Sequence, residues 1–212
     1  MRTIIFDLDG TLIDSRPGIF AGVAHAMTRL KLPLPDPTGL DWVIGPPLEH
    51  VMRDLLAPHA DDRMTQAVSY YRQYYASIGL YNARPYDGVH ELLEHLKSRG
   101  RSLFIGTSKL TPFAEAILDH FGLSPYLAGI HGANPDGRSH DKADLFRHIL
   151  ESRRLNPAET VVVGDRRFDV AGAIACGLDV VAVTYGYGSA DELRSAGAQV
   201  FADSPAALLS IL

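Results

Sequence analysis

The sequence predicts an α/β fold, with a doubly wound, mostly parallel sheet and an inserted all-helical domain. Three observations lead to this prediction. Over most of the chain, apolar runs typical of strands alternate with helix-like segments, a pattern that favours a parallel sheet with helices on both faces. Residues 15–83 instead contain only helical patterns. The 212 residues, 46% of them hydrophobic and 21% charged, are typical of a globular protein with a substantial core.

Six apolar runs are the expected strands, and all belong to the predicted α/β core, residues 1–14 and 84–212. The runs are residues 2–7, 102–107, 126–131, 160–164, 179–184 and 198–202. Helices are expected at 88–99 and 111–121, each followed by a glycine stop. Ser189 and Glu192 have the spacing of a capping box that opens a further helix. Ligands of an open parallel sheet lie outside the carboxyl ends of its strands, so motifs at those ends should share one crevice.

The predicted insert, residues 15–83, contains three stripes of apolar or tyrosine-rich residues at helical spacing. They lie near residues 19–30, 48–56 and 64–79. The tyrosines of the third stripe could stack on a nucleobase, but two adjacent pairs on one helix favour packing within the protein. Pro17 and Pro85 mark the connections to the core, which are candidate hinges.

Two carboxylates, Asp7 and Asp9, stand two residues apart where the first apolar run ends. Positions two apart in a strand face the same side, so mutual repulsion would disfavour the doubly charged state. A divalent metal ion between the two acids would remove this repulsion. Gly10 gives the backbone freedom to turn away from the strand. Taken alone, the segment is equally compatible with a polar turn at a strand end.

Together with three later segments, this segment resembles the motifs of the haloacid dehalogenase (HAD) superfamily. The first motif is Asp7-Leu8-Asp9-Gly10-Thr11, after an apolar strand. The second is a Ser or Thr at the end of a strand, matched by Thr107, and the third is a Lys that opens a helix, matched by Lys142. The fourth, G-D-x-x-x-D, is matched by Gly164-Asp165 and Asp169. Four motifs in the family's order make the resemblance specific, and they span almost the whole chain.

The resemblance implies a Rossmann-like, HAD-like core and identifies residues 15–83 as a helical cap of the C1 type. It also implies a Mg²⁺-dependent phosphomonoester hydrolase that forms an aspartyl phosphate. Asp7 would be the nucleophile, and Asp9 would protonate the leaving alkoxide and then deprotonate the attacking water. Thr107 would hydrogen-bond a phosphoryl oxygen, and Lys142 would offset the charge shared by the nucleophile and the phosphate. Alone, a capping Thr and a solvated Lys would be the simpler interpretations.

In the same resemblance, Mg²⁺ would be held by an Asp7 carboxylate oxygen, the Asp9 backbone carbonyl and Asp165, with waters completing an octahedron. Asp169 would be an outer or water-mediated partner that orients the ligands. Two other charged residues near the motifs, Lys109 and Asp141, are expected to lie on the surface. The second acid, Asp9, disfavours a dehalogenase, because the dehalogenases that name the family lack it.

Substrate choice is expected to depend on the cap. The segment from Ile44 to Glu49 resembles the start of a cap helix that faces the active site in phosphoglycolate-phosphatase-like and 5′-nucleotidase-like members. Residues 79–86 and 185–189 resemble the bacterial 5′-nucleotidase-like subgroup. A nucleoside 5′-monophosphate is therefore the favoured substrate, and phosphoglycolate or another sugar phosphate is the alternative. The candidate substrate-binding residues are Gly45, Pro46, Glu49, His50, Arg53 and Ser108.

The composition of the chain limits the classes of binding partner that are expected. The net charge of −5 provides no general attraction to nucleic acid or an anionic membrane, so a small phosphomonoester is expected to be the partner. No apolar run approaches the roughly 20 residues that span a bilayer, and the first motif leaves no room for a cleaved leader. The single cysteine, Cys176, suits a reducing compartment, and a cytoplasmic monomer or homodimer is expected. A phosphate-binding regulatory protein without turnover is the alternative from another class.

Overall fold

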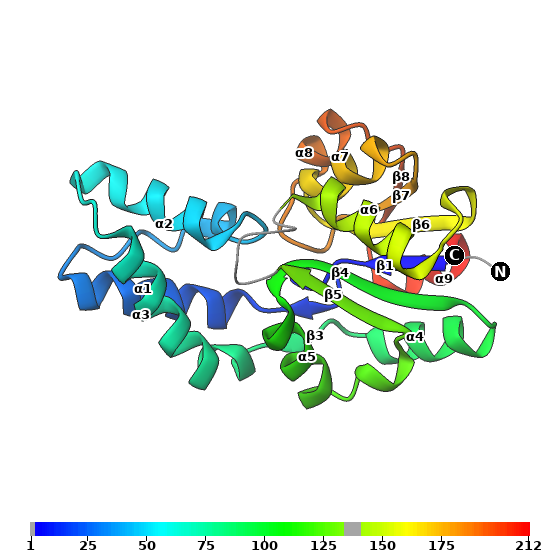
Figure 1. Cartoon of the computed structure of the whole chain (residues 1–212), viewed down its shortest axis with the longest axis horizontal. Helices are drawn as coiled ribbons and strands as arrows, with labels where there is room; N and C mark the ends of the chain where they lie inside the picture. The colour runs from blue at the N-terminus through cyan, green and yellow to red at the C-terminus, as the bar shows by residue number, and fades with distance from the viewer. Residues whose placement is uncertain (1–2, 134–140) are drawn as a thin grey trace. The chain divides into compact units, whose positions relative to one another are not determined.

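The computed structural model describes residues 3–133 and 141–212 and divides the chain into two compact units. The first unit is Met1–Asp14 with Pro85–Leu212, and the second is Ser15–Arg84. Residues 1–2, at the predicted first strand, and residues 134–140, within the predicted core, lie outside the described residues. Figure 1 shows the chain coloured by residue number from the N-terminus to the C-terminus.

A six-stranded sheet forms the centre of the first unit, and every pairing described in it is parallel. Its order is β5-β4-β1-β6-β7-β8. The central strand β1 places Ile5 opposite Phe104 of β4 on one side and Val162 of β6 on the other. The predicted parallel α/β fold is therefore confirmed. The strands are β1 (Thr3–Phe6), β4 (Ser102–Leu110), β5 (Gly129–Ala133), β6 (Thr160–Gly164), β7 (Asp179–Val183) and β8 (Val200–Ala202).

The largest differences from the predicted strand ends are in β5 and β4. The strand β5 begins at Gly129 rather than at residue 126, because Ser124–Tyr126 forms a 3₁₀ helix with a proline in its first turn. The strand β4 continues to Leu110 rather than ending at residue 107, and its pairing with β5 shifts register between Gly106 and Leu110. Thr107 and the two residues after it therefore belong to the carboxyl-terminal part of a strand.

Helices cover both faces of this sheet, with α6 and α7 on one face and α4 and α5 on the other (Figure 1). The helix α8 opens with Ser189, whose hydroxyl accepts a hydrogen bond from the Glu192 amide, as the capping box predicts. The α-helices described in the unit are α4 (Val89–Ser98), α5 (Thr111–His120), α6 (Lys142–Arg153), α7 (Arg167–Ala175), α8 (Ala190–Ser195) and α9 (Pro205–Ile211).

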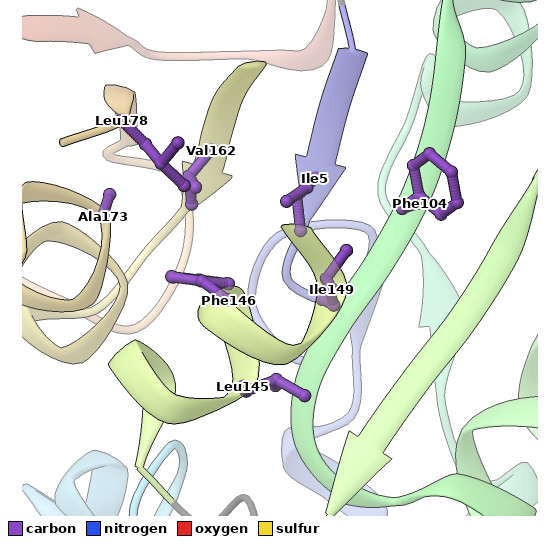
Figure 2. Close-up of a cluster of buried hydrophobic side chains, with 8 residues drawn as sticks. All are labelled: Ile5, Phe104, Leu145, Phe146, Ile149, Val162, Ala173 and Leu178. Atoms are coloured by element: carbon purple, nitrogen blue, oxygen red, sulfur yellow. The ribbon is translucent and has the colours of Figure 1, made fainter. Parts of the chain in front are cut away.

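A buried hydrophobic cluster joins the three central strands to α6 and α7 (Figure 2). Strands covered on both faces bury successive side chains, so the central strand is apolar without alternation. The cluster packs α6 and the last turn of α7 against the three central strands. Its members are Ile5, Phe104, Leu145, Phe146, Ile149, Val162, Ala173 and Leu178.

The second unit is built from α1 (Arg16–Leu30), α2 (Leu48–Leu56) and α3 (Met64–Ser77), with short 3₁₀ helices at Leu40–Val43, Ala57–His59 and Gly79–Tyr81. The helices α1 and α3 pack closely, because a Cβ on Gly22 would lie 2.8 Å from the Tyr71 ring. Tyr71 and Tyr75 are buried with their rings stacked, and Tyr74 stacks on His25. The predicted packing role of this tyrosine stripe is thus confirmed for those three residues.

Short strands β2 (Ile13–Asp14) and β3 (Arg84–Pro85) pair at the chain positions where the two units are connected. These positions coincide with the connections marked by prolines in the sequence. Among the described helices, none combines the length and the apolar character that crossing a bilayer requires.

We predict that Phe146→Ala lowers the free energy of unfolding by about 3–5 kcal/mol, because it empties a fully buried aromatic site in the central cluster. Leu209→Ala is the control, since Leu209 is 38% exposed and its truncation should change stability by less than about 0.5 kcal/mol. Urea unfolding followed by circular dichroism measures both changes. Equal losses for the two variants would contradict the assignment of the core.

Candidate active site

The carboxyl ends of three adjacent strands carry polar side chains. Asp7 directly follows β1, Asp165 directly follows β6, and Thr107 lies in β4. Because β1 lies between β4 and β6, the three positions meet at one edge of the sheet. Asp169 in the first turn of α7 and Lys142 at the start of α6 complete the group. This edge is the expected place for a ligand of a parallel sheet.

Three buried carboxylates form the centre of the site. Asp7, Asp165 and Asp169 each offer a carboxylate oxygen, and these oxygens lie within 4.8 Å of one another. Burial raises the pKa of Asp7 to about 7, an effect that Lys142 opposes and Asp169 reinforces. Burial, together with the charges of Asp7 and Asp169, also raises the pKa of Asp165. Such a cluster of hard oxygen ligands fits a divalent cation.

The ammonium of Lys142 is buried among these carboxylates. Its Nζ lies 2.6 Å from Asp7 Oδ1, 2.7 Å from Asp169 Oδ1 and 2.8 Å from the Gly106 carbonyl oxygen. Burial alone would lower the pKa of Lys142, but the attraction of Asp169 and Asp7 outweighs it and the pKa is raised. Three carboxylates and one ammonium leave two negative charges, which a divalent cation would balance.

The start of α6 is fixed by Asp141, the residue before Lys142. Its carboxylate accepts hydrogen bonds from the backbone amides of Ala143 and Asp144. Asp141 is exposed, as predicted, and its local role is that of a helix cap. The cap places the lysine in the first turn of the helix, where its side chain reaches Asp7.

A loop after β7 holds the carboxylate of Asp165 in place. The backbone amide of Tyr187 donates a hydrogen bond of 2.7 Å to Asp165 Oδ2. A Cβ on Gly186 would lie 2.3 Å from the Gly10 carbonyl oxygen, and a Cβ on Gly10 would lie 2.2 Å from Asp165 Oδ2. Neighbouring atoms therefore leave no room for a side chain at Gly10 or at Gly186. Residues 185–189 entered the sequence analysis only through the family resemblance, although Gly186 and Gly188 in this segment are a signal of close backbone approach.

Asp169 is held from two sides. Its Oδ1 pairs with Lys142, and its Oδ2 accepts the backbone N–H of Arg166 at 3.1 Å. The guanidinium of Arg166 in turn pairs with Glu192 of α8. These contacts fix the orientation of Asp169 and leave it suited to orienting neighbouring groups.

Asp9 forms an ion pair that the sequence analysis missed. The Nζ of Lys109 lies 3.1 Å from Asp9 Oδ2, and the two side chains are only 7% and 13% exposed, respectively. The prediction that Lys109 lies on the surface is wrong, because β4 continues past residue 107 and carries it into the site. The sequence did contain a signal for this contact: Lys109 lies two residues after the motif threonine, Thr107, and positions two apart in a strand face the same side. That threonine is buried, Ser108 is partly buried, and Thr107 Oγ1 accepts the Lys109 amide at 3.2 Å.

The other candidate substrate-binding residues belong to the second unit and remain predictions. Gly45 and Pro46 precede α2, where Gly45 has a positive φ of 108°. Glu49 is partly buried and pairs with Arg72 of α3 at 2.8 Å. His50 and Arg53, on the same helix as Glu49, are exposed.

The profile of the haloacid dehalogenase-like hydrolases matches residues 4–183. The chain belongs to the haloacid dehalogenase-like hydrolase family. A 5′-nucleotidase of Pseudomonas aeruginosa is 39% identical over 211 residues, which cover 99% of this chain and 94% of that protein. A phosphoglycolate phosphatase of Rhodospirillum rubrum is 32% identical and covers 98% of this chain and 89% of its own. The predicted family resemblance is confirmed.

Two further relatives of this HAD-like hydrolase bear on its fold and activity. The tyrosine-protein kinase PtkA of Mycobacterium tuberculosis is 39% identical over 190 residues, which are 90% of this chain and 64% of PtkA. The solved structure of a predicted phosphatase from Clostridium acetobutylicum has a TM-score of 0.91 and 36% identity, and the match covers 99% and 97% of the two chains. The fold is thus shared with that predicted phosphatase over 99% of this chain.

We predict that the stability contributed by Asp7 to the metal-free protein falls as pH rises. A carboxyl whose pKa is raised from 3.8 to about 7 on folding stabilises the folded state at low pH and loses this contribution as pH rises through 7. Thermal unfolding of the protein and of Asp7→Asn, both in chelator, measures the difference between pH 5 and pH 8. Added Mg²⁺ should restore stability at pH 8. The melting temperature of the unmodified protein minus that of Asp7→Asn should be lower at pH 8 than at pH 5. A higher value at pH 8 would contradict the assignment.

Proposed function

We propose that this HAD-family hydrolase is a Mg²⁺-dependent phosphomonoesterase that acts through an aspartyl phosphate on Asp7. The observation that supports it best is the position of Asp7. Its carboxylate lies at the carboxyl end of the central strand, one oxygen is held by Lys142, and two further buried carboxylates lie beside it. A carboxylate in that setting is suited to act as an oriented nucleophile.

Each step can be assigned to residues of this chain. The Asp7 carboxylate attacks phosphorus, an Asp7–phosphorus bond forms, and the bond to the leaving alkoxide breaks while Asp9 donates its proton to that oxygen. Water then attacks the aspartyl phosphate, Asp9 takes the proton of that water, and inorganic phosphate and free Asp7 are released. Thr107 would donate a hydrogen bond to a phosphoryl oxygen, and Lys142 would stabilise the charge shared by Asp7 and the phosphoryl group.

The metal site in this proposal consists of an Asp7 carboxylate oxygen, the Asp9 backbone carbonyl and Asp165. Asp169, whose two oxygens already contact Lys142 and the Arg166 amide, would orient the others. When bound, Mg²⁺ would neutralise part of the charge on the phosphoryl oxygens.

The proposed substrate is a small phosphomonoester, with a nucleoside 5′-monophosphate favoured over phosphoglycolate or another sugar phosphate. The 5′-nucleotidase relative supports the first choice, and the phosphoglycolate phosphatase relative supports the second. The helical second unit would act as the cap that selects among these substrates. A cytoplasmic location and a monomeric or homodimeric state remain predictions.

Two alternatives lead to different products. A phosphate-binding regulatory protein would bind the ester without turnover. A kinase, suggested by the PtkA relative, would pass the phosphoryl group to a tyrosine hydroxyl instead of to water. Release of inorganic phosphate, with no phosphorylated protein formed from ATP, separates hydrolysis from both.

We predict that the protein releases inorganic phosphate from p-nitrophenyl phosphate in Mg²⁺ and that chelation abolishes this activity. Asp7→Asn should abolish turnover and keep the folded state, because it removes the nucleophile from a strand end outside the hydrophobic core. Asp165→Ala should retain turnover only at a sharply raised Mg²⁺ concentration. Phosphate release and thermal unfolding are measured for each protein, with Asp144→Asn, an exposed residue of α6, as the control. Full activity in chelator would refute the metal site.

A substrate panel tests the proposed role of the second unit. Substitution of Glu49, His50 or Arg53 by Ala should change the ranking of phosphomonoesters by kcat/KM about tenfold or more, equivalent to roughly 1.4 kcal/mol. Turnover of p-nitrophenyl phosphate should change much less, because it depends on the core site. Asp54→Ala, exposed on the same helix, is the control. In the unmodified protein, a preference of more than about tenfold for phosphoglycolate over nucleotides would refute the nucleotidase assignment.

A further inference from the structure

Lys109 is a buried cation to which the proposed mechanism gives no role. Its side chain is 7% exposed, although lysine is almost never buried without a partner. Its ammonium pairs with Asp9, and Nζ lies 3.1 Å from Asp9 Oδ2. Burying an ion pair rarely adds net stability over apolar residues, so stability alone does not explain why a lysine lies here.

The two oxygens of Asp9 are in different surroundings. Oδ2 is paired with Lys109, whereas Oδ1 is buried and has no hydrogen-bond partner among residues 3–133 and 141–212. A carboxylate turns easily about its last side-chain bond, because that torsion has a broad energy profile. The ion pair on Oδ2 therefore fixes the plane of the group and determines where Oδ1 lies. Oδ1 is then the oxygen left to exchange a proton with a substrate.

The backbone at the end of β4 helps to position Lys109 for its contact with Asp9. The register of β4 against β5 shifts between Gly106 and Leu110, and the Lys109 amide donates a hydrogen bond to Thr107 Oγ1. The same segment at the end of β4 therefore positions both the Thr107 hydroxyl and the Lys109 ammonium. Lys142 contacts Asp7 and Asp169, so the two lysines serve different carboxylates.

We propose that Lys109 is a positioning residue that holds Asp9 so that its Oδ1 transfers the proton to the leaving group. This proposal rests on the proposed function. Because a p-nitrophenolate leaves without a proton and an alkoxide requires one, loss of positioning penalises alkyl esters selectively.

The test measures kcat and KM for p-nitrophenyl phosphate and for the alkyl phosphomonoester that the unmodified protein hydrolyses fastest. Lys109→Met should lower kcat on the alkyl ester about tenfold or more beyond its effect on the aryl ester, with KM changed little. Lys109→Arg, which keeps a cation near Asp9, should recover part of this loss. Lys97→Met, on α4 outside the site, is the control and should change neither substrate. Lys109→Gln serves as a second variant if Lys109→Met does not fold.

A double-mutant cycle completes the test. Asp9→Asn combined with Lys109→Met should be no worse on the alkyl ester than Asp9→Asn alone, because the lysine would act only through Asp9. Equal losses on the two esters, or losses that multiply in the double variant, would overturn the role of Lys109 and leave the phosphatase assignment standing. Failure of the unmodified protein to hydrolyse either ester would overturn both.

Discussion

A cluster of three buried carboxylates, two of which contact one buried ammonium, is the constraint that the rest of the site depends on. Asp7, Asp165 and Asp169 repel one another, and Lys142 balances only part of their charge. An apolar protein interior makes this arrangement costly unless every oxygen has a partner or a cation. The hydrophobic cluster beneath α6 and α7 supplies the rigidity that holds the charged groups together. Burial is the main cause of the raised pKa values of Asp7 and Asp165, and the repulsion among the carboxylates adds to it.

The end of β4 contributes several contacts of the site from one short segment. Gly106 accepts a hydrogen bond from Lys142 through its carbonyl, Thr107 presents its hydroxyl, and Lys109 reaches Asp9. Thr107 and Lys109 are two positions apart in β4, and positions two apart in a strand face the same side. The segment therefore contacts Asp9 directly through Lys109, and it contacts Lys142, the partner of Asp7, through the Gly106 carbonyl.

The second unit uses its aromatic residues largely for its own packing. Tyr71 and Tyr75 are buried, and Tyr74 stacks on His25, so these rings stabilise the helices. Polar residues of α2 differ from them, because His50 and Arg53 are exposed. Specificity that depends on such exposed residues can change while the helical scaffold stays intact.

The sequence by itself determined the parallel α/β fold and the charged groups of the site. Apolar runs mark strands wherever both faces are buried, and motifs after parallel strands must share one edge, so the meeting of Asp7 and Asp165 was predictable. Lys142, which opens a helix, was identified through the family resemblance. Tertiary structure alone decided the burial of Lys109, the end of β4 and the approach of Gly186 to Asp165. These features depend on strand register and on contacts between residues far apart in the chain, which local sequence patterns do not contain.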